Sequence, residues 1–343
     1  MGFETSSHAK HWLFTEDTIL RMRKESHARG VAGVLAAYAD HAEFLGTPPA
    51  DDAFPSVEDE TVLVDFYAQQ MWVLCKKVEL PPKVFGCAVI FLKRFYLKTS
   101  VLEYVPKEVM LTALVLAAKS EEVHIAPSAF AAKFKVKPEA IIALEIMMLE
   151  KLSFHLMVYQ VWHPIGGFVD MFRRLDPECD WQTLRDEAME WARDAMLSDL
   201  ILQYPPSQLA LAATCLAADE AGLDADTFLA HQFPGPENDA LRATIRELEN
   251  ALDTASQTTL DKAAARAANA ALDATRNPLL DPESALSKHL AERALEDKAT
   301  AQLAELERAN ARRAAKQREL MGFDDGGAGS SSDDAPVAMV EGK

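Results

Sequence analysis

Cysteine and glycine are scarce in this chain of 343 residues, and the shortage of each excludes a class of protein. The four cysteines form no CxxC pair and no Cys/His cluster with zinc spacing, so neither a metal nor another cofactor is expected. Cys75, Cys87 and Cys215 lie in apolar stretches and are predicted to be small core residues. Only 14 residues are glycine and 49% are hydrophobic, which favours packed cores over a wholly disordered chain.

Long apolar runs are missing as well. Charged residues interrupt every apolar stretch well before the roughly 18 residues of a membrane span, so no membrane association is expected. Residues 1–10 are polar and lack the apolar segment of a signal peptide. We therefore expect a reducing cytosolic or nuclear compartment.

The motifs of catalytic machinery are absent too. The chain has no glycine-rich nucleotide loop, no His-Arg-Asp or Asp-Phe-Gly motif, no Walker loop and no paired metal histidines, so it is predicted not to be an enzyme. Its formal net charge of -18 repels phosphate backbones. This charge disfavours direct nucleic-acid binding and favours a protein partner.

Helical periodicity is what the sequence has in abundance. Apolar residues recur at three- and four-residue spacing, and no stretch shows sustained strand-like alternation, which predicts an all-α fold. The predicted organisation comprises an N-terminal helical segment, two helical domains, a charged helical extension and a disordered tail. These occupy residues 1–55, 56–160, 161–255, 256–320 and 321–343.

The N-terminal segment contains an aromatic motif, His11-Trp-Leu-Phe14, directly before a helix start. Thr15 is predicted to cap that helix, and the acidic residues after it suit the positive end of the helix dipole. Trp12 and Phe14 are predicted to anchor the segment to a domain.

Prolines punctuate the first predicted domain, where they open helices because the missing N–H of a first-turn proline costs nothing. Five helices are expected, at about 57–78, 82–97, 107–122, a short one opening at Pro127 and Ser128, and 139–152. The third carries no charge from Met110 to Ala118 on any face, so it is predicted to be the central helix of the domain.

This central helix recurs one hundred residues later. The sequence from residue 106 is PKEVMLTALVLAAKSEE, and from residue 206 it is PSQLALAATCLAADEAG, with six identities among seventeen aligned residues. The similarity indicates a duplicated domain. Lys119 corresponds to Asp219 and Glu122 to Gly222, so the core repeats while the charged exit of the helix differs. We expect one copy to carry a site that the other supports.

Five motifs, in order and with similar spacing over about residues 8–250, resemble the cyclin family, in particular its H type; residues 91–97 and 100–104 together form one of them. They are His11–Phe14, Phe91–Leu97, Ser100–Tyr104, Met110–Glu122, Leu152–Leu156 and Tyr204–Leu211. The resemblance implies two tandem five-helix cyclin-box domains with flanking N- and C-terminal helices.

The resemblance also implies a function and partners. H-type cyclins are regulatory subunits of the CDK-activating kinase, which phosphorylates CDK activation loops. Within transcription factor IIH, it phosphorylates the C-terminal repeats of RNA polymerase II. The implied partners are a cyclin-dependent kinase catalytic subunit, a RING-finger assembly subunit and the transcription factor IIH core, in the nucleus.

The same resemblance assigns a kinase-binding site. Lys119 and Glu145 match the polar centre of the cyclin–kinase contact, flanked by Ser120 and Glu122. The matching apolar positions, which would grip one kinase helix, are Leu116, Ile146, Leu149, Phe154 and Leu156. An apolar groove supplies affinity and a few charged groups fix register.

Less specific interpretations remain open for these residues. Lys119 and Glu145 can pair with each other on a solvated surface, and Phe154 and Leu156 can be ordinary core residues. Ser120 departs from the apolar residue that cyclins often have beside the lysine. The first helix, around Val64–Met71, lacks the Met-Arg-Ala-Ile-Leu substrate-docking pattern of mitotic cyclins.

Two other proteins of the same fold are alternatives. One is another transcriptional cyclin, of the C type. The other is a transcription-factor-IIB-like core, which binds DNA and normally has a zinc ribbon and basic faces that are missing here.

The C-terminal region is rich in alanine and charge. Residues 284–320 are predicted to form a long helix that packs on the domains or a partner, or stays solvated. Its partial apolar stripe comprises Leu286, Leu290, Leu295, Leu303 and Leu306.

Overall fold

The computed structural model describes residues 2–124, 130, 134, 138–257, 261–281 and 284–320. Over these residues the secondary structure is helical and contains no strand, which confirms the all-α prediction. The chain forms two units, residues 1–282 and residues 283–343. The first unit contains both predicted cyclin boxes. The second is described through a single long helix.

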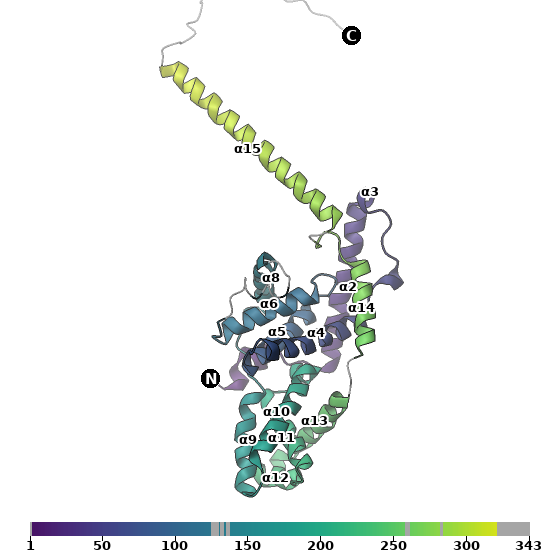
Figure 1. Cartoon of the computed structure of the whole chain (residues 1–343), viewed down its shortest axis with the longest axis vertical. Coiled ribbons are helices and arrows are strands. Elements are labelled where there is room, and N and C mark those ends of the chain that lie inside the picture. Colours follow the sequence, from purple (N-terminus) through teal and green to yellow (C-terminus); the bar gives the residue numbers. More distant parts are fainter. Residues whose placement is uncertain are drawn as a thin grey trace, which may run out of the picture. The chain divides into compact units, whose positions relative to one another are not determined.

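The described helices of the first box are labelled in Figure 1, and their bounds lie within two residues of the predicted ones. They are α4 (Val57–Lys77), α5 (Pro82–Lys98), α6 (Pro106–Ser120) and α8 (Pro138–Lys151). Ser56 and Asp59 close a reciprocal capping box at the start of α4, while prolines open the other three. The short helix expected at Pro127 and Ser128 lies outside the described residues.

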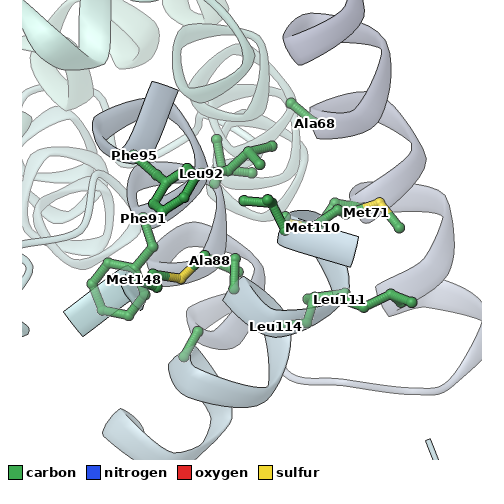
Figure 2. Packing of buried hydrophobic residues seen from close by; sticks show 14 of the residues in the cluster. Ala68, Met71, Ala88, Phe91, Leu92, Phe95, Met110, Leu111, Leu114 and Met148 are labelled. Carbon is green, nitrogen blue, oxygen red and sulfur yellow. The ribbon is translucent and has the colours of Figure 1, made fainter. Parts of the chain in front are cut away.

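Helix α6 is the centre of this box. Every residue from Val109 to Ala118 is buried, as predicted for a helix that is apolar all round. Figure 2 shows Leu111 and Leu114 of α6 among side chains of the surrounding helices, including Met71 of α4 and Met148 of α8. Truncating such a buried leucine to alanine typically lowers the free energy of unfolding by about 2–5 kcal/mol. The packing around α6 is therefore a large contribution to the stability of the box.

The second box has a similar order of helices, and its central helix is shifted by one hundred residues. Its elements are α9 (Trp162–Leu175), α10 (Trp181–Leu197), the 3-10 helix η3 (Asp199–Leu202), α11 (Pro206–Glu220), α12 (Ala225–Gln232), the 3-10 helix η4 (Pro236–Asn238) and α13 (Asp239–Gln257). The bounds of α11 are those of α6 plus one hundred, and α11 is buried along its length in the same way. Cys75, Cys87 and Cys215 are buried in the two cores, as predicted.

The N-terminal segment is anchored to both boxes. It contains η1 (Phe3–Thr5), α1 (Ser7–His11), α2 (Glu16–Asp40), α3 (Ala42–Leu45) and η2 (Asp51–Ala53). Trp12 is buried in the first core, and the Phe14 backbone N–H donates to the Leu202 carbonyl at 2.8 Å. Thr15 caps α2 by accepting from the Thr18 N–H at 3.4 Å. The predicted anchoring and cap are both confirmed.

A buried ionic network lies where α2 and the two boxes meet. The Lys93 ammonium group donates to Asp65 at 2.8 Å and to Asp199 at 3.2 Å, and its side chain has no exposed area. Arg23 of α2 forms two parallel bonds to Asp199 at 2.7 and 2.9 Å. Burial alone would raise the pKa of Asp199, but Lys93 and Arg23 hold it well below its usual range. The four charges tie α2, α4, α5 and η3 together.

The region predicted as one charged extension, residues 256–320, contains two helices. Helix α14 (Lys262–Thr275) packs against α4 of the first box and buries Ala268 and Leu272 in that core. Helix α15 (Ala285–Leu320) forms the second unit and exposes Leu295, Leu303 and Leu306. The predicted disordered tail, 321–343, lies outside the described residues. No described helix is long and apolar enough to cross a membrane.

Candidate functional site

Lys119 and Glu145 are brought together at one end of the first box. Lys119 lies in the last turn of α6 and Glu145 in the middle of α8. The Lys119 ammonium group donates to the two carboxylate oxygens of Glu145 at 2.5 and 2.8 Å. The Lys119 side chain is 52% exposed and that of Glu145 is 16% exposed. The pair therefore forms, as the less specific interpretation allows, but its lysine still faces solvent and can meet a partner.

The predicted apolar positions around this pair differ in exposure. Ile146 and Phe154 are solvent-exposed, at 59% and 66%, so neither is an ordinary core residue. Leu149 and Leu156 are half-buried against the first core. Leu116 is only 4% exposed because it belongs to the fully buried face of α6. Leu116 therefore packs in the core and contributes almost no exposed area to this surface.

Two further exposed apolar residues lie on α8 and on the chain that follows it, and they were not predicted from the sequence. Ile142 is 53% exposed and lies one helical turn before Ile146 on α8, while Met157 is 59% exposed just after Leu156. The four-residue spacing of Ile142 and Ile146 was a usable signal, since such residues share a helix face. Ile142, Ile146, Phe154 and Met157 are thus all exposed on α8 or on the chain that follows it, and we call these four residues the apolar strip.

The chain after α8 turns in an unusual backbone conformation. Ser153 and Phe154 both have positive φ angles, of 53° and 58°. This left-handed region costs a non-glycine residue about 1–2 kcal/mol. The Phe154 N–H donates to the Leu149 carbonyl at 2.9 Å, and the His155 N–H donates to the Leu152 carbonyl at 3.0 Å. These two bonds close the end of α8, and the exposed Phe154 lies in the turn that they form.

The two residues predicted to flank Lys119 also lie at this end of the box. The Ser120 hydroxyl lies 3.5 Å from the Leu156 carbonyl oxygen, at the limit of a hydrogen bond, and so approaches the chain that follows α8. Glu122 is exposed and has a positive φ of 57° just past the end of α6. Neither residue adds apolar area to this end of the box.

The chemistry of this surface suits binding. Among the described residues, no group of three His, Cys, Asp or Glu side chains could hold a metal ion. Cys87, the cysteine nearest this end of α6, is buried, and burial together with Glu121 raises the pKa of its thiol to about 12, so it is a poor nucleophile. What remains is an exposed apolar strip with one charged pair, the composition of a protein-binding surface.

Comparison with known proteins gives this surface a context. The family model "Cyclin, N-terminal domain" matches residues 47–157, and "Cyclin C-terminal domain" matches residues 163–264. Cyclin-H of Xenopus laevis is 30% identical over 239 residues, which cover 66% of this chain and 72% of that protein.

Two solved complexes contain chains of similar structure. A chain of the yeast TFIIK (Kin28/Ccl1/Tfb3) complex is 28% identical, with a TM-score of 0.59 over 73% of this chain and 100% of that chain. A chain of the CAK complex from Chaetomium thermophilum matches with a TM-score of 0.71 over 95% of this chain and 98% of that chain. Its 23% identity makes it a match of fold alone. Because both cyclin domains match in order and a cyclin-H relative is 30% identical over most of its length, this chain belongs to the cyclin family and, within it, to the H type.

Proposed function

We propose that this chain is the regulatory subunit that binds and activates a cyclin-dependent kinase, and that the contact is made by α6, α8 and the turn after α8. The observation that carries the proposal is the exposed apolar strip of Ile142, Ile146, Phe154 and Met157 beside the Lys119–Glu145 pair. The H-type relatives and the TFIIK complex, in which a related cyclin accompanies a kinase, support it.

The apolar strip supplies the affinity in this scheme. A protein kinase is active when a conserved glutamate on its mobile helix pairs with the lysine that positions ATP. A strip of exposed isoleucine and phenylalanine side chains buries the apolar face of such a helix and favours its inward position. Because the cyclin binds the active arrangement better than the inactive one, it shifts the kinase toward the active state.

The charged pair supplies register. Lys119 uses part of its donor capacity on Glu145 and, being half exposed, can donate to carbonyl oxygens at the end of a kinase segment. Glu145 is held in place by Lys119 and can accept backbone N–H groups from the partner. The pair is preorganised, so little side-chain entropy is lost when the kinase binds.

The finer assignments follow from membership of the H type. We propose that the kinase is the CDK-activating kinase, which phosphorylates CDK activation loops and the C-terminal repeats of RNA polymerase II. A RING-finger assembly subunit and the transcription factor IIH core would complete the complex, in the nucleus. The catalytic groups would all belong to the kinase.

Copurification with the kinase catalytic subunit, followed by a kinase assay on a polymerase repeat peptide, tests the proposal. Wild type is compared with Lys119→Ala plus Glu145→Ala, for which we expect at least about tenfold weaker binding. The matched control is Asp226→Ala plus Arg246→Ala, which removes an exposed ion pair of 2.7 Å from the second box. The control should bind and activate like wild type.

The outcomes separate the site from the family assignment. If the folded double variant activates as well as wild type, the contact is elsewhere. If wild type itself neither binds nor activates, the H-type kinase is the wrong partner. The kinases of other transcriptional cyclins, such as the C type, would then be tested.

A further inference from the structure

The N-terminal segment contacts the chain that follows α8 through four residues. The Trp12 indole N–H donates to Nδ1 of His155 at 3.1 Å, and the His11 ring stacks on His155 with 5.0 Å between ring centres. The Tyr159 backbone N–H donates to Nδ1 of His8 at 3.3 Å, and Phe3 meets the Tyr159 ring edge-on at 5.3 Å. We call these four N-terminal residues, Phe3, His8, His11 and Trp12, the N-terminal clamp.

Trp12 also connects the clamp to the turn that carries Phe154. The Lys98 ammonium group lies 4.5 Å from the centre of the Trp12 ring, within the range of a cation–π contact. It also donates to the Lys151 carbonyl at 2.8 Å and to the Ser153 hydroxyl at 3.2 Å. One side chain of α5 therefore contacts both the clamp tryptophan and the first left-handed residue of the turn.

A second cation depends on the same tryptophan. The Arg94 guanidinium lies 4.8 Å from the Trp12 ring centre, and its side chain is completely buried. Within the described residues, none of its three nitrogens has a hydrogen-bond partner. Burial lowers the pKa of Arg94 to about 9. The contact with Trp12 therefore contributes to keeping this charge in the core, which fixes the ring in place.

These contacts explain how an unfavourable backbone persists. Ser153 and Phe154 are consecutive non-glycine residues in the left-handed region, and such a conformation persists only when its surroundings hold it. Lys98 donates to the Ser153 hydroxyl at one end of the turn, and Trp12 of the clamp donates to His155 at the other end. Phe154 lies between these two supports and is exposed at 66%.

We infer that Trp12 and His155 are positioning residues for the partner-binding surface, because the clamp holds the left-handed turn that presents Phe154. The binding consequence rests on the proposed function, whereas the conformational consequence concerns this chain alone. Two experiments therefore address the two separately.

The first experiment needs no partner. Hydrogen exchange is measured at the backbone amides of Phe154 and His155 in the full chain. His155→Ala removes the acceptor of the Trp12 N–H, whereas His155→Asn retains an acceptor oxygen at a similar position. We expect about fivefold faster exchange in His155→Ala, the effect of losing one hydrogen bond, and near wild-type exchange in His155→Asn. Equal exchange in all three proteins would overturn the inference.

The second experiment uses the kinase. The dissociation constant is measured for Trp12→Phe, Phe154→Ala and the double variant. If the clamp acts through Phe154, Trp12→Phe should weaken binding about fivefold in the wild-type background. It should not weaken binding further in the Phe154→Ala background. The same loss in both backgrounds would mean that Trp12 acts only on stability, and the inference fails.

The matched control is Trp181→Phe. Trp181 lies on α10 of the second box, is 39% exposed and has Arg173 5.2 Å from its ring centre. It should change neither the exchange rates nor the dissociation constant. If wild type does not bind the kinase, the proposed function fails, and the exchange experiment still decides whether the clamp holds the turn.

Discussion

The two boxes end their central helices with the same backbone geometry and different side chains. After α6, the Val123 N–H donates to the Ala118 carbonyl at 2.8 Å, and after α11 the Leu223 N–H donates to the Ala218 carbonyl at 2.8 Å. The residue one before each donor is left-handed, with φ of 57° at Glu122 and 77° at Gly222. This pattern closes helices by satisfying their last carbonyls. The two copies therefore share the backbone geometry of the helix end, although their side chains at this point differ.

The side chains at these exits have different uses. Lys119 of the first box donates to the Glu145 side chain of α8, whereas the corresponding Asp219 accepts from the Ala225 backbone N–H at 3.3 Å, at the start of the next helix. The first box exposes the strip described above, while the large exposed apolar residues described in the second are only Leu175 and Trp181. The same scaffold thus exposes an apolar strip in one copy and stabilises its own next helix in the other.

The largest expected effect concerns the junction that holds the boxes together. Asp199→Asn leaves the fully buried Lys93 and the Arg23 guanidinium without their shared carboxylate, so the free energy of unfolding should fall by about 3 kcal/mol or more. Denaturant unfolding at pH 7 measures it. Asp226→Asn removes one partner of an exposed ion pair and should cost no more than about 0.5 kcal/mol. Similar losses in both variants would show that the junction is not a buried network.

The next largest expected effect is a change in the free energy of unfolding that arises in the second box and depends on pH. Burial, with Asp219 and Asp226 nearby, raises the pKa of Glu249 to about 7 from an ordinary value of 4.5. The folded chain therefore keeps a proton that the unfolded chain has lost, and stability falls as pH rises from about 4.5 through 7. Glu249→Gln removes this penalty and should stabilise the protein by about 1–2 kcal/mol at pH 8, with allowance for solvent screening.

Thermal unfolding of wild type and Glu249→Gln across this pH range checks the prediction. The gain should become small at pH 4.5, where Glu249 is neutral in the folded chain and only half ionised in the unfolded chain. A gain that is the same at every pH would mean that the glutamine acts through packing and that Glu249 is not protonated.

Exchanging the left-handed residues tests the backbone comparison directly. Gly222→Ala places a side chain at a positive φ with no neighbouring atom to clash against, so only the backbone cost of about 1 kcal/mol should appear. Glu122→Gly relieves the same cost in the first box and should stabilise it by about 0.5 kcal/mol. Unfolding free energies of the two variants should therefore move in opposite directions, and changes of the same sign would break the comparison.

The smallest stability effect should come from the charged pair itself. Lys119→Ala plus Glu145→Ala removes an ion pair whose lysine is half exposed, so the free energy of unfolding should change by no more than about 0.5 kcal/mol. Denaturant unfolding of the kinase-free chain measures it. A loss of several kcal/mol would identify the pair as a structural element of the first box and remove the reason for a binding role.

Much of the helical framework could be predicted without coordinates. Helices α4, α5, α6 and α8 start and end within two residues of their predicted bounds, because proline, capping residues and apolar spacing act over one or two turns. The resemblance brought Lys119 and Glu145 to one site although 26 residues separate them, and the structure pairs them. Leu116 proved to be buried, since a helix surrounded on all sides leaves no surface at its middle.

Other features had no signal in the sequence pattern. Lys93 and Arg94 are charged residues, and charge ordinarily predicts exposure, yet both are buried on α5. The left-handed turn at Ser153 and Phe154 lacks the glycine that would have marked it. The packing of α14 on α4 joins segments about two hundred residues apart, which no local periodicity reveals.

The sequence by itself determined the helices, their caps, the duplication of the central helix and the family to which the chain belongs. These follow from interactions between residues a few positions apart, or from motifs that keep their order along the chain. The tertiary structure alone decided which charges are buried together, which apolar residues stay exposed beside Lys119 and how the N-terminal clamp holds the turn at Phe154. Those outcomes depend on contacts between distant segments, whose partners are settled only when the cores pack.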